Sequence, residues 1–277
     1  MSIAEDTSRS LIEDEAAFIG ARIFPAVPAF NVDAVMKRVS FKVRAQREEV
    51  PAKSLAVLLP ALDEEDGIGD VIDSIPWQTI KVSGYKTKIL VVDGHSKDST
   101  RRIAEQKGAK VLLQNGRGKG FAVRKGLEEA DSDFLVMMDA DGTYPAGEIP
   151  TFLKLLENGA DVVMGSRMLG RIEKGAMSDM NRAGNRILSF MASMIYGEKT
   201  SDVCTGMWGL NRKAIETLRL NSTGFEIEAE MFAQAVKGGL TIHEVPVSYS
   251  RRLGTAKLSS LNCGLKIALK LLRKRFF

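Results

Sequence analysis

Long uncharged apolar segments are missing from this chain of 277 residues. No run reaches the roughly 18 apolar residues that a transmembrane helix needs, so we expect no such helix. The N-terminus also lacks the charged, apolar and small-residue order of a secretory signal peptide. Both absences favour a cytoplasmic location.

Cysteine and aromatic residues are scarce. The two cysteines, Cys204 and Cys263, are far apart and match no metal-ligand spacing, so we expect a reducing compartment and inert thiols. Aromatic residues make up 6% of the chain, and few of them are interleaved with basic residues. This pattern disfavours a nucleic-acid-binding module, and we expect no nucleic acid as partner.

Acidic residues are absent from the C-terminal tail. From Arg251 onward the chain has eight basic residues and no Asp or Glu. Because the whole chain has 39 Lys and Arg against 35 Asp and Glu, the part before the tail is mildly acidic. A basic tail of this kind suits an anionic membrane surface, a phosphorylated ligand or a nucleic acid.

Residues 1–50 are predicted to form a separate helical extension. A helix over 11–23 and a second one ending near Gln46 are separated by Pro25 and Pro28. No catalytic pattern occurs there, so packing or partner docking is the expected role.

Residues 51–258 are predicted to form one α/β domain. Five short apolar runs have the length of buried parallel strands, and amphipathic segments separate them. The runs are Leu55–Pro60, Ile89–Asp93, Lys110–Leu113, Phe134–Met138 and Asp161–Gly165. Helices are expected between them at about 65–75, 99–107, 120–130 and 149–158. We therefore expect a mainly parallel central sheet flanked by helices.

Polar or charged residues follow all five runs. Ligands of such sheets bind beyond the carboxyl ends of the strands. The segments that leave those ends are 60–65, 93–96, 115–120, 139–145 and 165–167. We expect them to meet at one edge of the sheet.

Two carboxylates, Asp139 and Asp141, follow the fourth run. Strand alternation directs them to the same side. Carboxylates that close repel each other unless a cation lies between them, and a hard divalent cation that also binds phosphate oxygens fits there. The alternative is a turn in which the Asp side chains bond the backbone.

The segment Gly116-Arg117-Gly118-Lys119-Gly120 matches neither the dinucleotide fingerprint nor the P-loop. It still brings Arg117 and Lys119 to the N-terminus of a helix, which is a generic site for a diphosphate. A solvated turn is the alternative. Beside the Asp pair, the segment favours a nucleoside diphosphate and a metal.

In this order, the five segments resemble the motifs of family 2 glycosyltransferases with the GT-A fold. The resemblance covers about residues 55–258. It is strongest to polyprenyl- or dolichyl-phosphate glycosyltransferases, above all to archaeal members that start N-glycan assembly. It implies metal-dependent, inverting transfer of a sugar from a nucleotide diphosphate to a lipid phosphate. Asp-Gly-Thr-Tyr at 141–144 suggests a UDP-sugar, with GDP-mannose as the alternative donor.

The resemblance assigns roles to individual residues. The expected nucleotide-binding residues are Pro60, Leu62, Glu64, Asp93, Lys119 and Asp139. Asp93 would face the base, and Lys119 and Arg167 would face phosphates. Asp141, with Asp139 beside it, would hold Mg²⁺ or Mn²⁺. Asp141, Arg167 and Asp202 are the expected catalytic residues.

The acceptor decides whether a base is needed. A phosphate monoester is largely ionised at pH 7 and needs only cations around it. The expected acceptor and phosphate residues are Arg117, Arg182, Arg186, Arg252 and Lys257. A hydroxyl acceptor, on a metabolite or a glycan, would instead need a carboxylate base, and Asp202 is the candidate. On this reasoning Asp202→Asn costs little activity with a lipid phosphate and most of it with a hydroxyl.

Three features of the second half have open roles. Segment 177–196, with Arg182 and Arg186 on one face, is either a core-packed helix or an interfacial one. The acids Glu226, Glu228 and Glu230 support the substrate pocket or bind metal. Residues 259–277 form a basic amphipathic helix, which is expected to contact the cytoplasmic face of a membrane or to pack on the body.

A sugar-nucleotide pyrophosphorylase is the remaining enzyme alternative. Such enzymes usually carry a Gly-rich signature in the first loop. The first loop here, Pro60-Ala61-Leu62-Asp63-Glu64, is acidic instead.

Overall fold

The computed structural model describes residues 52–254 and 260–276. The helices expected over residues 1–50, and Lys257, lie outside this part. Residues from Ala52 onward form one compact unit.

Seven strands form one sheet in the described part of the chain. They are β1 (Lys53–Ala61), β2 (Tyr85–Asp93), β3 (Lys110–Leu113), β4 (Phe134–Met137), β5 (Val162–Ser166), β6 (Trp208–Asn211) and β7 (Ile242–Pro246). Their order across the sheet is β3-β2-β1-β4-β6-β5-β7. β6 is antiparallel to its neighbours β4 and β5, whereas the other pairs are parallel. The five expected strands are confirmed, and β6 and β7 are additional.

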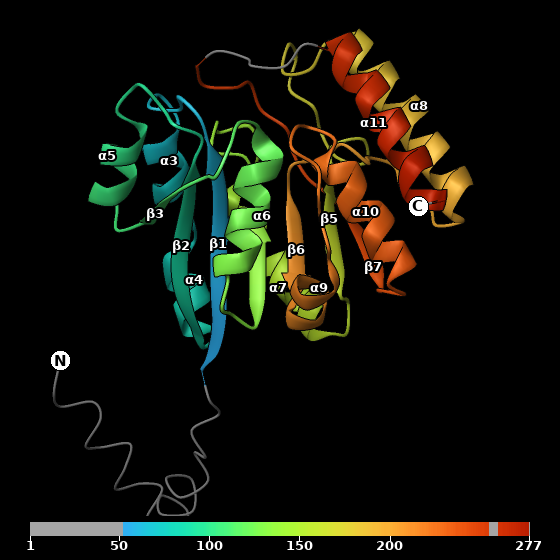
Figure 1. Cartoon of the computed structure of the whole chain (residues 1–277). Coiled ribbons are helices and arrows are strands. Elements are labelled where there is room, and N and C mark those ends of the chain that lie inside the picture. Colours follow the sequence, from blue (N-terminus) through green and yellow to red (C-terminus); the bar gives the residue numbers. More distant parts are fainter. Residues whose placement is uncertain (1–51, 255–259, 277) are drawn as a thin grey trace, which may run out of the picture. The chain divides into compact units, whose positions relative to one another are not determined.

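Helices cover both faces of the sheet (Figure 1). One face carries α3 (Ile68–Asp73), α4 (Trp77–Val82), α5 (Thr100–Gln106) and α7 (Ile149–Glu157). The other carries α6 (Lys119–Glu129), α8 (Asp179–Tyr196), α9 (Arg212–Thr217), α10 (Ile227–Lys237) and α11 (Ser260–Phe276). A single 3₁₀ turn, Ala146–Glu148, precedes α7.

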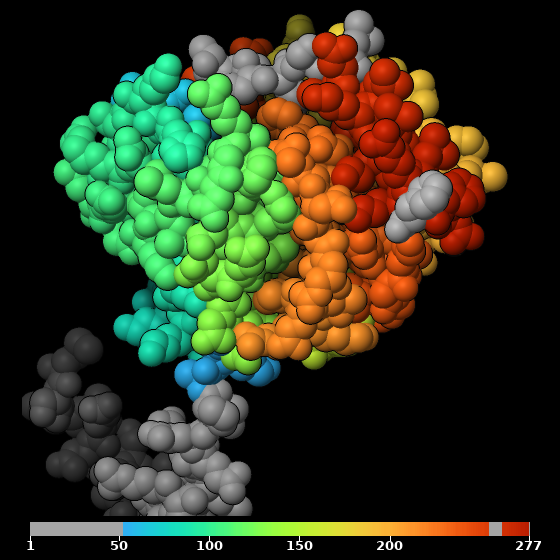
Figure 2. Space-filling view, viewed as in Figure 1, coloured from blue at the N-terminus to red at the C-terminus, as the bar shows by residue number. Residues whose placement is uncertain are grey.

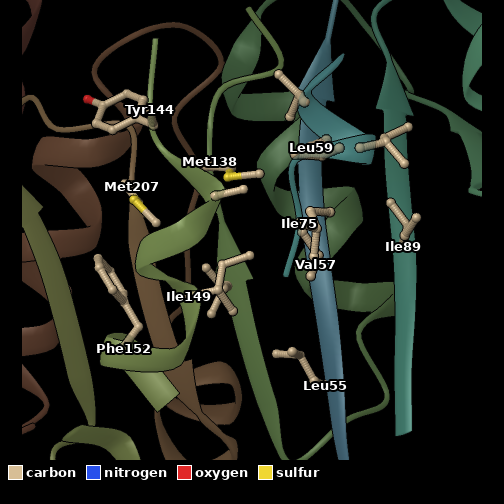
Figure 3. Close-up of a cluster of buried hydrophobic side chains, with 14 of the residues drawn as sticks. Leu55, Val57, Leu59, Ile75, Ile89, Met138, Tyr144, Ile149, Phe152 and Met207 are labelled. Atoms are coloured by element: carbon tan, nitrogen blue, oxygen red, sulfur yellow. The ribbon is translucent and has the colours of Figure 1, made fainter. Parts of the chain in front are cut away.

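Alternation along β1 divides the core into two layers. Leu55, Val57 and Leu59 belong to one layer, which Figure 3 shows, and Ala56 and Leu58 belong to the other. All five side chains are fully buried. Strands covered on both faces need apolar residues at every position, which explains the continuous apolar runs in the sequence.

The carboxyl ends of the five expected strands meet at one edge of the sheet. β1 pairs in parallel with both β2 and β4, and β2 pairs in parallel with β3. β5 runs in the same direction as β4 because β6 between them is antiparallel to both. The expected convergence of the strand exits is confirmed.

The C-terminal helix α11 packs on the body beside α8 (Figures 1 and 2). Its Ile267 and Leu271 are buried in the second core layer. The helix was expected over 259–277, and its packing on the body is one of the two roles left open by the sequence. Within residues 52–254 and 260–276 no helix has the length and hydropathy required to cross a bilayer.

Candidate active site

A cavity of about 780 Å³ lies where the strand exits meet helices α8 and α11. We call it the strand-end cavity. On its strand side it is lined by Pro60, Leu62 and Glu64 after β1, and by Asp139 and Asp141 after β4. The motif residues at these strand ends therefore share one cavity.

Asp93 is not among the residues that line the strand-end cavity. Its side chain is fully buried, and Oδ2 accepts hydrogen bonds from the backbone N–H groups of His95 (2.9 Å) and Ser96 (3.0 Å). The neighbouring Gly94 lines the cavity instead. Asp93 thus shapes the loop after β2, and its Oδ1 has no hydrogen-bond partner among the described residues.

Two residues with a left-handed backbone tie the loops after β1, β2 and β3 together. They are Asp63, with φ 46°, and His95, with φ 69°. Asp63 Oδ1 accepts a hydrogen bond from the Lys97 N–H (2.7 Å), and His95 Nε2 lies 3.0 Å from the backbone oxygen of Gln114. Non-glycine residues adopt this conformation only when their surroundings hold them there, so these contacts fix the loop geometry.

Lys119 is largely buried and lies between two carboxylates. Its Nζ lies 2.5 Å from Asp139 Oδ1 and 2.6 Å from Glu228 Oε1. Burial acts to lower the Lys119 pKa, but the two carboxylates outweigh it and raise the pKa, so the ammonium stays charged. Lys119, which was expected to face a phosphate, is thus paired with protein carboxylates, and one of these is Asp139.

The glycines around Lys119 serve close packing. A Cβ on Gly118 would lie 2.3 Å from the backbone oxygen of Thr223, and one on Gly120 would lie 2.3 Å from that of Ser222. The Gly120 N–H donates to Thr223 O at 3.0 Å. The sequence predicted a generic diphosphate site at this helix N-terminus. At these two positions the glycines let α6 start against the segment before α10.

Asp141 is buried and paired with Arg252. Its Oδ1 accepts hydrogen bonds from the N–H (3.1 Å) and Oγ1 (2.6 Å) of Thr143, and its Oδ2 lies 3.0 Å from Arg252 Nη1. Burial, and then the charge of Asp139, raise the pKa of Asp141. A nearby cation stabilises the charged form of such a carboxylate.

Arg167, which is partly buried, and Asp202, which is fully buried, form a bidentate pair. Arg167 Nε and Nη2 donate to the two oxygens of Asp202, both at 2.7 Å. Arg167 lines the strand-end cavity and stacks on the Tyr249 ring at 5.2 Å, whereas Asp202 is fully buried outside the lining. Burial acts to lower the Arg167 pKa, but Tyr144 and then Asp202 raise it.

The three acids near α10 have three different environments. Glu228 lines the strand-end cavity, and its burial raises its pKa. Glu226 Oε1 accepts hydrogen bonds from the Thr223 and Gly224 N–H groups. Glu230 is fully buried and lies 2.7 Å from Lys274 of α11. Of the two roles predicted for these acids, pocket support matches the geometry of Glu228.

Three expected phosphate-binding arginines do not line the strand-end cavity. Arg117, Arg182 and Arg186 are all exposed, and none is among the residues that line it. α8 presents Asn181, Asn185 and Leu188 to the cavity instead. The i,i+4 arginine pair therefore occupies another face of the helix.

The helix side of the strand-end cavity is largely apolar. It is lined by Met177 and by residues of α8 and α11, namely Met180, Ile187, Leu188, Leu265 and Ile267. Several large apolar side chains on the same two helices are exposed, and these are Met180, Ile187, Phe190, Met194, Leu265, Leu269, Leu272 and Phe276. The cavity thus joins a charged region at the sheet edge to an apolar surface.

The donor set for a metal is small. No group of three or more His, Cys, Asp or Glu residues suited to a metal occurs among the described residues. Of the two aspartates, Asp139 is paired with Lys119, and Asp141 is the buried one. Mg²⁺ in nucleotide sites commonly takes one or two carboxylates and completes its shell with phosphate oxygens and waters. Asp141 fits that arrangement when a diphosphate is present.

Sequence reasoning missed several residues that line the strand-end cavity, among them Gln114 and Cys204. The segment that leaves β3 was predicted to begin at Asn115. Gln114 directly precedes it, so the prediction missed this residue by one position. Cys204 was interpreted as inert, and burial raises its pKa to about 12, which keeps the thiol protonated at neutral pH.

The sequence model of the family described as Glycosyl transferase family 2 matches residues 56–219. This range contains the exits of β1 to β5 and the Arg167–Asp202 pair. The chain belongs to glycosyl transferase family 2. This is the family that the motifs resemble.

Three curated relatives come from Haloferax volcanii. Glycosyltransferase AglJ is 36% identical over 200 residues, covering 72% of this chain and 64% of the relative. Low-salt glycan biosynthesis hexosyltransferase Agl6 is 36% identical over 215 residues, covering 77% and 52%. Dolichyl-phosphate hexose transferase is 35% identical over 216 residues, covering 77% and 90%. The chain thus spans less than two thirds of the length of the first two relatives.

A solved structure shares the fold. Glucosyl-3-phosphoglycerate synthase from Mycobacterium tuberculosis, crystallised with Mn²⁺, UDP and phosphoglyceric acid, matches with a TM-score of 0.65 and 21% identity. The match covers 81% of this chain and 79% of that chain. Together with the family match, it confirms the expected GT-A fold.

Proposed function

We propose that this glycosyltransferase moves a sugar from a nucleoside diphosphate, with UDP favoured, to the phosphate of a polyprenyl or dolichyl lipid. One observation carries the proposal. The strand-end cavity joins the buried carboxylates and cations of the sheet edge to an apolar side between α8 and α11. A phosphorylated lipid has a charged phosphate at one end and an apolar chain behind it, which match these two sides of the cavity.

The nucleotide side of the proposal rests on the strand side of the cavity. Pro60, Leu62 and Gly94 offer an apolar wall for a nucleobase, and Lys119 and Asp139 line the same cavity. A Mg²⁺ or Mn²⁺ ion on Asp141 would neutralise charge on the leaving diphosphate. Arg252, beside Asp141 in the wall, would contribute a further positive charge to a phosphate there.

The acceptor side needs cations and no base. A phosphate monoester has a second pKa near 6, so it reaches the site ionised and attacks without giving a proton to the protein. Arg167 lines the cavity with a guanidinium held rigidly by Asp202. We infer that Asp202 is a positioning residue, since its oxygens accept bonds from Arg167 and from Asn185 Nδ2 (2.8 Å).

A hydroxyl acceptor is the second candidate, and one observation favours it. Glu228 lines the cavity, and burial raises its pKa toward the range of a general base. Glu228, and not Asp202, would then accept the proton. Glu228→Gln would abolish transfer to a hydroxyl and leave transfer to a phosphate largely intact.

We propose that the protein is peripheral at the cytoplasmic face of a membrane, through the surfaces of α8 and α11. Leu265, Leu269, Leu272 and Phe276 of α11 are exposed. Lys270 and Lys274 are turned to Glu230, which leaves Arg273 and Arg275 as exposed cations of the last turn. Apolar anchors flanked by cations are typical of helices that bind an anionic interface.

A donor screen tests the proposed function. The full chain is incubated with polyprenyl phosphate, Mn²⁺ or Mg²⁺, and labelled UDP-glucose, UDP-N-acetylglucosamine or GDP-mannose. We expect label from a UDP-sugar to partition into organic solvent, and Asp141→Asn to abolish it. Label that enters the organic phase only from GDP-mannose would assign the alternative donor. Label that stays in water with every donor would contradict a lipid acceptor.

A further inference from the structure

Arg252 bridges two carboxylates that belong to different strand exits. Its Nη1 lies 3.0 Å from Asp141 Oδ2, and its Nη2 donates to Glu64 Oε1. All three residues line the strand-end cavity. The guanidinium thus stands beside the carboxylate that fits a divalent cation.

The backbone holds Arg252 in this place. The Leu253 N–H donates to Asp141 O at 2.9 Å, and the Ser250 N–H donates to Thr143 O at 3.0 Å. The segment 250–253 therefore lies along 141–143 by main-chain bonds. This pairing brings Arg252 next to Asp141, and its side chain reaches Asp141 Oδ2 from there.

The carboxylate of Asp141 offers a cation one oxygen. Oδ1 already accepts two hydrogen bonds from Thr143, so a metal has to take Oδ2, which Arg252 contacts. A divalent ion there would lie a few ångströms from a guanidinium, and like charges so close repel strongly at a buried site. A diphosphate supplies the negative charge that lets both cations stay.

We propose that Arg252 occupies the place of the divalent cation on Asp141 and makes metal binding conditional on the donor diphosphate. The proposal rests on the proposed metal-dependent transfer. Without donor, Arg252 neutralises Glu64 and Asp141, and the metal binds weakly. With donor, Arg252 turns to the diphosphate, Asp141 Oδ2 becomes free, and metal and nucleotide bind as a unit.

The test measures Mn²⁺ binding directly, from the electron paramagnetic resonance signal of free Mn²⁺, with and without UDP. In the wild type we expect UDP to tighten Mn²⁺ binding at least tenfold. In Arg252→Gln we expect Mn²⁺ alone to bind at least tenfold more tightly than in the wild type, and UDP to add little. Arg252→Lys, which keeps the charge but cannot bridge both acids, should fall between the two.

Arg251→Gln is the matched control. Arg251 is the adjacent arginine, but it pairs with Glu173 and with the backbone oxygen of Lys174. Its variant should bind Mn²⁺ as the wild type does. The proposal is overturned if Arg252→Gln binds Mn²⁺ alone as weakly as the wild type.

Asp141→Asn separates this proposal from the proposed function. If Asp141→Asn loses the UDP-dependent Mn²⁺ binding but Arg252→Gln changes nothing, the metal site stands and the role of Arg252 is refuted. If Asp141→Asn binds Mn²⁺ with UDP as the wild type does, the metal site itself is refuted, and both proposals fall.

Discussion

Arg167 donates two hydrogen bonds of 2.7 Å, from Nε and Nη2, to the carboxylate of Asp202. The backbone N–H of Arg167 also donates to Asp202 Oδ2, at 2.9 Å, and Asn185 Nδ2 donates to Oδ1. Asp202 is thus occupied and lies outside the strand-end cavity, whereas Arg167 lines it. Of the two residues, Arg167 is the one that faces the cavity.

This pairing changes what replacement of Asp202 should do. Asp202→Asn leaves the partly buried guanidinium of Arg167 with fewer acceptors and should destabilise the fold by about 1–3 kcal/mol. Its activity loss should equal that of Arg167→Met, and the double variant should lose no more than Arg167→Met alone. Steady-state transfer rates of the three variants check this. Losses that multiply in the double variant would show that Asp202 acts independently, as a base would.

Lys119 is the shared cation of Asp139 and Glu228, so its removal leaves the buried Glu228 and the partly buried Asp139 without their cation. Lys119→Met should lower the free energy of unfolding by about 3–5 kcal/mol. Lys119→Met/Glu228→Gln should recover part of that loss, because one of the unpaired charges is removed. Urea denaturation measures both.

Lys125→Met is the control for Lys119. Lys125 lies on the same helix and pairs with Glu129 near the surface. Such a pair contributes about 0.2–1 kcal/mol, so the control should stay within that range of the wild type. Equal stabilities of Lys119→Met and Lys125→Met would refute the structural role assigned to Lys119.

The sequence predicted strands β1 to β5 well, because strands that are buried on both faces appear in the sequence as unbroken apolar runs. β7 escaped notice because it is an edge strand whose buried positions are few, with His243 and Glu244 in its middle. β6 is a four-residue strand that contains Gly209. Such short stretches carry little periodic signal.

Partners of charged residues could not be predicted from the sequence. Arg252 pairs with Glu64, which is 188 positions away in the sequence. Lys119 pairs with Glu228 because α6 packs against the segment before α10. The i,i+4 rule placed Arg182 and Arg186 on one helix face, but it could not say which face turns to the cavity. That choice depends on the apolar contacts of α8 with α10 and α11.

The apolar helix side of the strand-end cavity predicts a chain-length effect. Ile187→Ser should raise KM for a long polyprenyl phosphate about tenfold, because an isoleucine contact contributes about 1.5–3 kcal/mol when fully buried. It should leave KM for a short, water-soluble isoprenyl phosphate unchanged. Kinetics in detergent, with both acceptors, measure this.

Met194→Ser is the matched variant for Ile187. Met194 lies on the same helix and is also exposed, but it is not among the residues that line the cavity. In detergent it should behave as the wild type with both acceptors. If the two variants change KM equally, the helix side does not bind the lipid chain.

The contact between Glu230 and Lys274 of α11 should stabilise the fold in a pH-dependent way. Burial acts to raise the pKa of Glu230, but Lys274 and the N–H of Ser222 lower it below the ordinary 4.5. Its contribution to stability is therefore fully present above the unfolded pKa of about 4.5 and is lost as the pH falls from there through the lower folded-state pKa. Glu230→Gln should cost about 1.5–3 kcal/mol at pH 7, and the difference from the wild type should shrink in acid.

Thermal or urea unfolding at pH 7 and pH 4 measures the contribution of Glu230. Glu216→Gln is the control, since Glu216 is exposed and pairs with Arg212 on α9. It should change stability by less than about 1 kcal/mol. A difference between Glu230→Gln and the wild type that does not shrink from pH 7 to pH 4 would refute the linkage.

The central claim is that the sugar goes to a lipid phosphate, and a matched pair of acceptors tests it most directly. Polyprenyl phosphate and the polyprenol of the same length are offered to the full chain with the preferred labelled donor and metal. Both have the apolar chain, but only the phosphate can attack without a base. We predict labelled lipid from the phosphate and none from the alcohol. Equal labelling of the alcohol, or label from neither lipid, would contradict the claim.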